Sequence, residues 1–487
     1  MIRFVLAAHV AAALAFALVV PLFEKPDEPH HLEYVRFLAR ARRLPRPLPA
    51  FPWHEEAIWK GVHPPLYYAG EAAVLLAADP LGVRGIASSP VYRLGRVRRA
   101  ERGPVPPGAI PVVDPRGFAF GGAGERMYVP DARDRFPYRY PFTVLRLLRL
   151  PGLLWGVLTV FCAWRAARLA LGGDARFAAV AAALVGLNPQ FCFLAGGITN
   201  DGLANLCAAL TVWLGLRHLL RGAAGRPARR VAGLGAAAGL GLLVKQTTAA
   251  SVPFALACVV LAARGRPFAR APGWRARVAA HAALCAACVI LAGGWWHVRL
   301  ARETGDAFGL RVRAAGYREE VTPRALTSPY FTAFGSAFPR EVFSSFWGRF
   351  GWMNIPTRPG VTVALAGLCA AGLAGLALRW GRGRTARGRP AFASPWIPWL
   401  LAGHGLVSLA GLVVENLTFT TMQGRYLFAS LAPFAILLAA GLKGWAGPLR
   451  RAGVTWGEAA VAWSVVGLLL AADAAGLTVV WRAYAAG

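Results

Sequence analysis

Acidic residues and lysine are scarce in this chain. Its 487 residues include 23 Asp and Glu against 54 Lys and Arg, and only four of those 54 are lysine. Charged residues make up 16% of the sequence, whereas hydrophobic residues make up 56%. A soluble domain of this length would interrupt its apolar pattern far more often. The composition therefore predicts an all-α polytopic membrane protein.

The chain also lacks the signals of several other classes. Its seven cysteines all fall within apolar segments, and Cys285-x-x-Cys288 has no second pair, which favours helix packing over a zinc or redox site. No small-residue cleavage site follows the apolar segment 3–22, which indicates a retained first span and not a signal peptide. No internal repeat is evident, although repeats are typical of transporters.

The positive charge is spread in short clusters between apolar segments. A formal net charge of +31 would suit a nucleic-acid-binding protein. The arginines, however, gather at 217–230, 264–277 and 379–389, which is the pattern of cytoplasmic loops in membrane proteins. A nucleic-acid-binding surface would need a contiguous soluble face, so no nucleic-acid partner is expected.

Apolar segments predict about 11 transmembrane helices in a single integral-membrane domain, 1–487. Nine segments of sufficient length lie at 3–22, 142–163, 177–195, 201–220, 277–296, 359–379, 396–414, 425–443 and 456–478. The apolar run 231–263 is too long for one helix and is interrupted by Lys245-Gln246. We expect two short spans that meet at this lysine.

Placing the arginine clusters in the cytoplasm orients the chain with its N-terminus inside. The long loops 23–141 and 298–357 are then external, and 20 of the 23 acidic residues fall on the external side or at its membrane face. The apolar segment 64–78 is short and has no second span to restore parity. It is predicted to be a re-entrant or juxtamembrane helix within the first external loop.

This topology brings five polar sets to one membrane face. They are Asp27-Glu28-Pro29-His30-His31, His63-Pro64-Pro65, Thr199-Asn200-Asp201, Lys245-Gln246 and Gln423-Gly424-Arg425-Tyr426. Each set alone has an ordinary explanation, such as a helix cap for Asp201 or an arginine that reaches the interface. Lys245 is harder to dismiss, because an unpaired ammonium inside an apolar run is costly.

Carboxylates together with a lysine and an arginine suit chemistry on a lipid phosphate. A carboxylate near a hydroxyl acts as a general base. Lysine and arginine stabilise a departing phosphate, the former as a point charge and the latter through a bidentate fork. The residues therefore predict an active site at this membrane face.

The same motifs carry a resemblance to a known family. The patterns P-D-E-x-x-H after the first span, H-P-P-L-Y-Y, N-D, K-Q-T, F-W-G-R-F-G-W and Q-G-R-Y-L-F resemble a bacterial family of predicted membrane proteins of unknown function. That family is similar to the GT-C glycosyltransferases, which include protein O-mannosyltransferases and aminoarabinose transferases. The resemblance extends from Asp27 to about Leu442.

The resemblance implies a GT-C-like bundle in the bacterial cytoplasmic (inner) membrane, with the active site on the extracytoplasmic side. It implies transfer of a sugar from a polyprenyl-phosphate donor to an unknown acceptor, with inversion, and contact with membrane lipids. Asp27 matches the catalytic acidic residue, with Glu28 beside it. The residues expected to bind substrate are His31, His63, Asp201, Lys245, Gln246, Arg425 and Tyr426.

Three alternatives remain beside this interpretation. Asp27, Glu28, His31 and His63 are suitable ligands for a divalent metal ion, although no metal motif of fixed spacing is present. The same charges would also serve a transporter or lipid flippase, or the chain would be a non-catalytic membrane subunit. Polar groups gathered on one face without a repeat favour the enzyme.

Overall fold

The protein is described from a computed structural model, which is almost entirely helical. It describes residues 1–47, 60–79, 113–114, 118–119, 132–222, 226–263, 273–316, 323–332, 337–383, 391–451, 453 and 456–485. In these ranges the strands are two antiparallel pairs, β1 (Val113–Asp114) with β2 (Phe118–Ala119) and β3 (Arg349–Phe350) with β4 (Ile355–Pro356). The all-α prediction is confirmed.

Eight helices in the described ranges are long and apolar enough to cross a membrane. They are Ile2–Val19 (α1), Phe142–Ala170 (α6 and α7), Asp201–Arg221 (α10), Trp274–Thr304 (α13, η4 and α14), Pro359–Arg379 (within α18), Ile397–Asn416 (α19), Gly424–Leu449 (η6 to α21) and Gly457–Ala485 (α22). A ninth span results if α8 (Ala175–Gly186) and α9 (Pro189–Ala195), bent by 62°, are counted as one. The chain is a multi-pass membrane protein.

The long run around Lys245 is broken where the sequence predicts. Helix α11 (Pro227–Val244) ends directly before Lys245, whose backbone is extended at φ −161° and ψ 138°. The 3-10 segment η2 (Gln246–Ala250) and α12 (Ser251–Ala262) follow. Helix α11 is one piece, and η2 with α12 is the other, and neither is among the eight candidates. With the bent pair counted as one span, these two pieces account for the predicted 11 helices.

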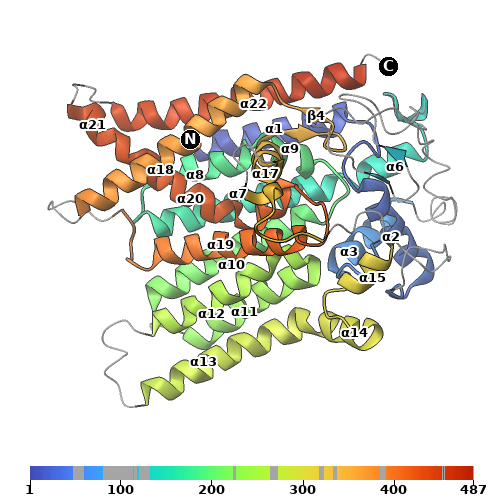
Figure 1. Ribbon diagram of the computed structural model, residues 1–487, viewed down its shortest axis with the longest axis horizontal. Coiled ribbons are helices and arrows are strands. Elements are labelled where there is room, and N and C mark those ends of the chain that lie inside the picture. The colour runs from blue at the N-terminus through green and yellow to red at the C-terminus, as the bar shows by residue number, and fades with distance from the viewer. Residues whose placement is uncertain are drawn as a thin grey trace.

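The long helices lie side by side, and shorter elements gather at one end of the bundle (Figure 1). The short elements at this end include α2 (Glu28–Ala41), α3 (Leu66–Ala78), α14 (Trp295–Thr304) and α15 (Leu310–Gly316). Helix α3 has 13 residues and so extends only about 20 Å, which is too short to cross a hydrocarbon core of about 30 Å. It packs against α2.

The remaining elements have the following bounds. They are η1 (Ala132–Asp134), α6 (Phe142–Leu147), α7 (Leu150–Ala170), α13 (Trp274–Val289), η4 (Ile290–Gly294), α16 (Pro329–Thr332), α17 (Ala337–Trp347), α18 (Pro359–Gly383), η6 (Gly424–Ser430), α20 (Leu431–Leu442), η7 (Lys443–Trp445) and α21 (Ala446–Arg451).

Small residues allow the helices of the core to approach closely. All residues of α8 from Phe177 to Gly186 are buried, and half of them are alanine. Helix α11 meets the π-helical turn η4 through Gly239 and Gly293, where a Cβ on Gly293 would lie 2.0 Å from the Gly239 carbonyl oxygen. Such close backbone contact is the usual means of association between membrane helices.

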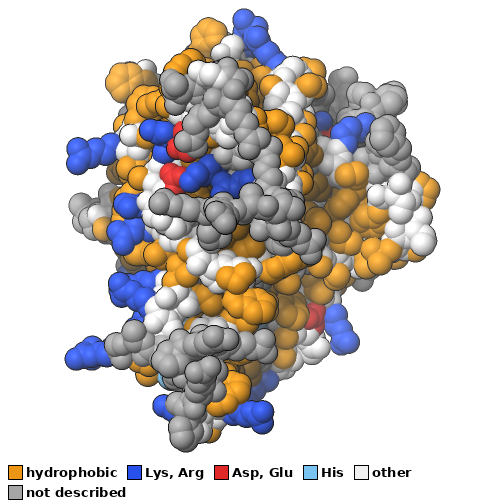
Figure 2. Space-filling model, turned by 90° about the vertical axis from the view of Figure 1, so that its left-hand side faces the viewer, with side chains coloured by type: hydrophobic (Ala, Val, Ile, Leu, Met, Phe, Trp, Pro, Cys, Tyr) orange, Lys and Arg blue, Asp and Glu red, His pale blue; other side chains and the backbone are white. Residues whose placement is uncertain are grey.

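The opposite end of the bundle is basic. Figure 2 shows Lys and Arg side chains spread over this face, with few acidic ones among them. Two of the acids near this end are paired across helices, Asp174 with Lys443 and Glu458 with Arg176. The described helix ends therefore keep the excess of positive charge that the sequence places at one face.

Candidate active site

The turn between α1 and α2 separates the side chains of Asp27 and Glu28. The backbone of Phe23 and Asp27 is left-handed, with φ of 73° and 64°. Asp27 is the residue before α2, which begins at Glu28 with Pro29 in its first turn. Non-glycine residues adopt this conformation infrequently, and aspartate tolerates it better than most.

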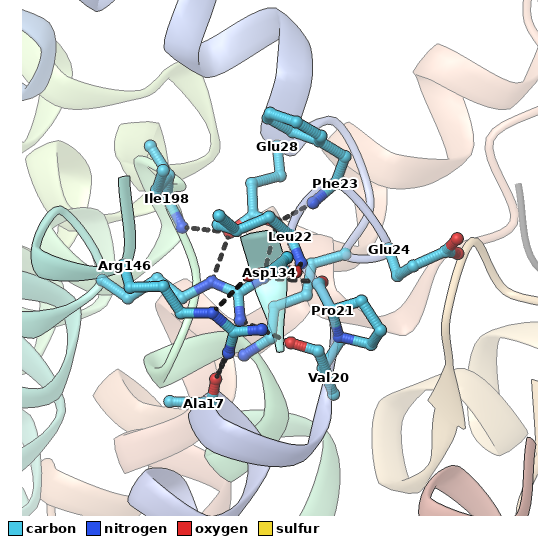
Figure 3. Close-up of polar contacts among 12 residues, drawn as sticks. Ala17, Val20, Pro21, Leu22, Phe23, Glu24, Glu28, Asp134, Arg146 and Ile198 are labelled. Atoms are coloured by element: carbon cyan, nitrogen blue, oxygen red, sulfur yellow. Dashed lines mark hydrogen bonds and ion pairs between the residues drawn. The ribbon is translucent and has the colours of Figure 1, made fainter. Parts of the chain in front are cut away.

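The Glu28 side chain is buried, and each of its carboxylate oxygens accepts two hydrogen bonds. It accepts hydrogen bonds from Arg149 Nε (2.8 Å) and Nη2 (2.7 Å) and from the backbone N–H groups of Phe23 (2.8 Å) and Ile198 (3.1 Å). Figure 3 shows Glu28 facing Phe23 and Ile198, while the Glu24 side chain points away from this network. Burial raises the pKa of Glu28, but Arg149 outweighs this effect and the pKa lies below its ordinary value. Four donors leave this carboxylate little capacity for a substrate.

Arg149 also holds the end of α1. Its Nη1 donates to the carbonyl oxygens of Ala17 (2.9 Å) and Val20 (2.7 Å), and its Nη2 donates to that of Pro21 (2.9 Å). These are carbonyl groups that the end of a helix leaves without partners. One buried guanidinium therefore joins the end of α1 to the start of α2 and sets the turn on which Asp27 lies.

Asp27 faces two cations and remains partly accessible. Arg425 Nη2 lies 2.6 Å from Asp27 Oδ2, and Lys60 Nζ lies 3.5 Å from Oδ1. The Asp27 side chain is 23% exposed, whereas that of Arg425 is 2% exposed. Burial raises the pKa of Asp27, but Lys60 and Arg425 outweigh it and hold the pKa well below the ordinary value. Asp27 is therefore ionised at neutral pH.

A second carboxylate, Asp201, lies on the other side of Arg425. Lys245 Nζ is 2.5 Å from Asp201 Oδ1, and Arg425 Nη1 is 3.5 Å from Asp201 Oδ2. Both cations also lie over the ring of Tyr426, at 5.3 Å for Lys245 and 5.4 Å for Arg425. Together with Asp27 and Lys60, the cluster holds three cations and two carboxylates. The excess positive charge favours binding of an anion.

The backbone before Arg425 fixes its position. The Gly424 N–H donates to Ser345 Oγ at 2.7 Å, and the Arg425 Nε donates to Gln423 Oε1 at 2.6 Å. A Cβ on Gly424 would lie 2.3 Å from the Val342 carbonyl oxygen, so only glycine fits against α17 here. The guanidinium is thereby aimed between the two carboxylates.

His31 and His63 lie in a buried polar network beside Asp27. His31 Nδ1 is 2.9 Å from Tyr68 Oη, and Asn200 Nδ2 is 3.3 Å from His63 Nδ1 and 3.4 Å from the same Tyr68 oxygen. Burial and Lys60 lower the pKa of both histidines well below the ordinary value. Both imidazoles are therefore neutral at neutral pH and act as hydrogen-bonding groups, not as cations.

Gln246 faces the segment that precedes α15. Its Nε2 donates to the Phe308 carbonyl oxygen at 2.9 Å, just before α15. The same helix is held by an ion pair of 2.5 Å between Arg313 and Glu415. Gln246 thus holds the segment before α15 beside Lys245.

The described residues do not form an obvious metal site. No group of three or more His, Cys, Asp or Glu that would suit a metal ion is present among them. The two carboxylates of the cluster already face Lys60, Lys245 and Arg425, and these cations would compete with a metal ion for the same oxygens.

The structure adds residues that the sequence analysis omitted. Lys60 belongs to the cluster and precedes the predicted substrate-binding residue His63 by three residues. Its closeness to His63 could therefore have identified it from the sequence. Arg149 lies at the start of an apolar segment, two residues before Pro151, and nothing in its local pattern indicates Glu28 as its partner. Of the predicted residues, Asp27, Asp201, Lys245, Arg425 and Tyr426 come together, whereas Glu28 faces Arg149 in a separate contact.

A family model for dolichyl-phosphate-mannose-protein mannosyltransferases matches residues 144–296, which include Asp201 and Lys245. The chain resembles GT-C glycosyltransferases. A comparison with curated protein sequences finds no match.

Two solved structures are similar to nearly the whole chain. ArnT from Cupriavidus metallidurans, bound to undecaprenyl phosphate, is 15% identical, with 98% of this chain and 75% of that chain covered and a TM-score of 0.46. The Archaeoglobus fulgidus oligosaccharyltransferase with a tethered acceptor peptide is 13% identical, with 99% and 55% covered and a TM-score of 0.44. The chain thus spans about half the length of the oligosaccharyltransferase, and at these identities the likeness concerns the fold alone.

Proposed function

We propose that this GT-C-like protein is an integral-membrane glycosyltransferase. It moves a sugar from a polyprenyl-phosphate donor to an acceptor hydroxyl, with inversion at the anomeric carbon. The observation that carries the proposal is a partly exposed carboxylate, Asp27, that faces Lys60 and Arg425. The cluster as a whole has three cations and two carboxylates and so one positive charge in excess. A base next to a phosphate-binding group is what this reaction requires.

Asp27 is the general base. Its carboxylate takes the proton from the acceptor hydroxyl as the oxygen attacks the anomeric carbon and the bond from that carbon to the phosphate oxygen breaks. The electron pair of the broken bond stays on the leaving polyprenyl phosphate. The protonated Asp27 then releases its proton to water, aided by the cations that hold its pKa low.

Lys60, Lys245 and Arg425 bind the phosphate. In the structure they are paired with Asp27 and Asp201, at N to O distances of 2.5 to 3.5 Å. A bound phosphate competes for the same donors and weakens their hold on Asp27, which leaves the base free to accept a proton. The Tyr426 ring under Lys245 and Arg425 limits where these cations can move.

The orientation follows from the arginine clusters. We place the cluster on the extracytoplasmic side of the bacterial inner membrane and the N-terminus in the cytoplasm. ArnT, a structural neighbour, is bound to undecaprenyl phosphate, and another neighbour, AglB from Archaeoglobus fulgidus, is in complex with an inhibitory peptide and a dolichol-phosphate. A lipid-linked donor for this chain is consistent with both.

The test is sugar transfer or donor hydrolysis by the purified protein in lipid nanodiscs, with a panel of polyprenyl-phosphate sugars. Asp27→Asn is expected to lower turnover by about 10²–10⁴-fold, because it removes the base while asparagine tolerates the same backbone conformation. Asp473→Asn removes a buried carboxylate in α22 and serves as the matched control. Full activity in Asp27→Asn would overturn the assignment, and no turnover with any donor would favour a transporter, flippase or non-catalytic subunit.

A further inference from the structure

Lys245 and Arg425, the two cations that contact Asp201, each lie at the start of a 3-10 segment. Lys245 directly precedes η2, and Arg425 is the second residue of η6. A 3-10 helix has weaker hydrogen-bond geometry than an α-helix and is often used where a helix changes course. Two such segments need support from outside to hold their cations in place.

A single histidine of α19 bonds to the last residue of η6 and to the residue that directly follows η2. His404 Nδ1 lies 2.7 Å from the Oγ of Ser430, the last residue of η6. His404 Nε2 lies 3.2 Å from the Oγ of Ser251, the residue that follows η2. All three side chains are buried. The imidazole is therefore a bridge between η6, which contains Arg425, and the start of α12, which η2 joins to Lys245.

One arrangement of protons satisfies every contact of this bridge. Ser251 donates to Nε2, Nδ1–H donates to Ser430 Oγ, and Ser430 donates to the His404 carbonyl oxygen at 3.2 Å. Ser408 Oγ, 2.6 Å from Ser430 Oγ, supplies a further donor to it. The neutral imidazole with its proton on Nδ1 is thus the tautomer that leaves no member of the network without a partner.

The surroundings keep this network in one geometry. The ring of Phe254 on α12 lies edge-on to His404 at 5.6 Å, and α19 packs against α12, η2 and η6. Within apolar surroundings an unmade hydrogen bond is costly, so the serines do not readily leave the histidine. Movement of one segment is consequently linked to movement of the other.

We propose that His404 is a positioning residue that holds Lys245 and Arg425 at the spacing a lipid phosphate requires. The inference rests on the proposed function, because the value of that spacing is phosphate binding. His404 itself lies apart from the phosphate-binding atoms and acts through η2 and η6. Its ring nitrogens are bonded to Ser251 and Ser430.

The experiment measures two quantities on the full chain in nanodiscs. Binding of undecaprenyl phosphate without a sugar reports the spacing of the cations, and backbone hydrogen exchange of residues 246–251 and 424–430 reports the hold on each segment. The variants are His404→Leu, Ser251→Ala and Ser430→Ala. His9→Leu is the matched control, because His9 is a buried histidine of α1 bonded to the Gly186 carbonyl oxygen.

His404→Leu is expected to weaken binding about tenfold and to speed exchange in both segments, since a cluster of hydrogen bonds that orients the cations is lost. Ser251→Ala should affect residues 246–251 first, and Ser430→Ala residues 424–430. His9→Leu should change neither. His404→Gln, which can keep one of the two contacts, serves where His404→Leu fails to fold and should fall between His404→Leu and the unaltered protein.

The outcomes separate this inference from the proposed function. Unchanged exchange in both segments in folded His404→Leu, or equal effects in His9→Leu, would overturn the positioning role. Wild-type protein that does not bind undecaprenyl phosphate, with the expected exchange pattern intact, would overturn the proposed function and leave His404 as a support of the two segments.

Discussion

Arg425 reaches across 398 residues of sequence to place its Nη2 2.6 Å from the Oδ2 of Asp27. The same guanidinium lies 3.5 Å from Asp201, so one buried arginine lies between a carboxylate of the α1–α2 turn and a carboxylate of α10. An anion that binds here competes with both acids for the arginine. The state of the proposed base is thus coupled to occupancy of the phosphate position.

Lys60→Met should move the acidic limb of the pH–rate profile to higher pH. Lys60 lowers the pKa of Asp27, so its removal raises that pKa, and the base becomes protonated at a higher pH than in the wild type. The measurement is the pH dependence of kcat/KM for sugar transfer. Lys443→Met, a lysine paired with Asp174 elsewhere in the bundle, is the control. An unmoved acidic limb would show that Lys60 does not act on the catalytic base.

Lys245→Met and Asp27→Asn should affect phosphate affinity differently. Loss of Lys245 removes a charge-assisted hydrogen bond, and affinity for undecaprenyl phosphate should fall by about 10–100-fold. Asp27→Asn removes a negative charge beside the phosphate position and should leave affinity equal or higher while transfer is lost. Equilibrium binding in nanodiscs measures both. Equal losses of affinity in the two variants would contradict this division of roles.

Arg149→Met should destabilise the protein by about 3–5 kcal/mol, because it leaves Glu28 buried without its partner. Arg176→Met breaks the ion pair with Glu458, in which the Arg176 side chain is 48% exposed. This change should lower the free energy of unfolding by only about 0–1 kcal/mol. Thermal unfolding in detergent compares the two, and a similar small effect in both would contradict the central role of Arg149.

Low pH should weaken the ion pair between Arg149 and Glu28. The folded-state pKa of Glu28 lies below its ordinary value of 4.5. The stabilisation is therefore fully present above pH 4.5 and is lost as pH falls toward the folded-state pKa. Unfolding of the wild type should become easier over this interval, whereas folded Glu28→Gln should show a smaller pH dependence. The same acid sensitivity in Glu28→Gln would assign it to other groups.

Gly424→Ala should impair phosphate binding through the backbone. The new Cβ would meet the backbone of Val342 and Phe346 at 2.3 to 2.6 Å and would push Arg425 from its position. Affinity for undecaprenyl phosphate should fall at least about tenfold, in line with the sensitivity of such sites to displacements near 1 Å. Gly467→Ala on α22, where nothing lies within 4 Å, is the control. Wild-type affinity in Gly424→Ala would mean that α17 yields to the methyl group.

Sequence patterns were enough for the features that depend on local composition. The long apolar runs, the break at Lys245 and the short helix at 66–78 all follow from hydropathy and charge, since a membrane permits few alternatives to helices of sufficient length. The gathering of Asp27, Asp201, Lys245 and Arg425 at one end also follows, because alternate spans return the chain to the same face.

Only the tertiary structure decided which charge meets which. Asp27 and Glu28 are neighbours in sequence, yet the left-handed backbone at Asp27 separates them, and one faces Arg425 while the other faces Arg149. Hydropathy reports the depth of a residue in the membrane but not its angle around a helix or the side chain across from it. Ion pairs and hydrogen bonds require donor–acceptor distances that are set to within a few tenths of an ångström. Such distances arise only when helices far apart in sequence pack together.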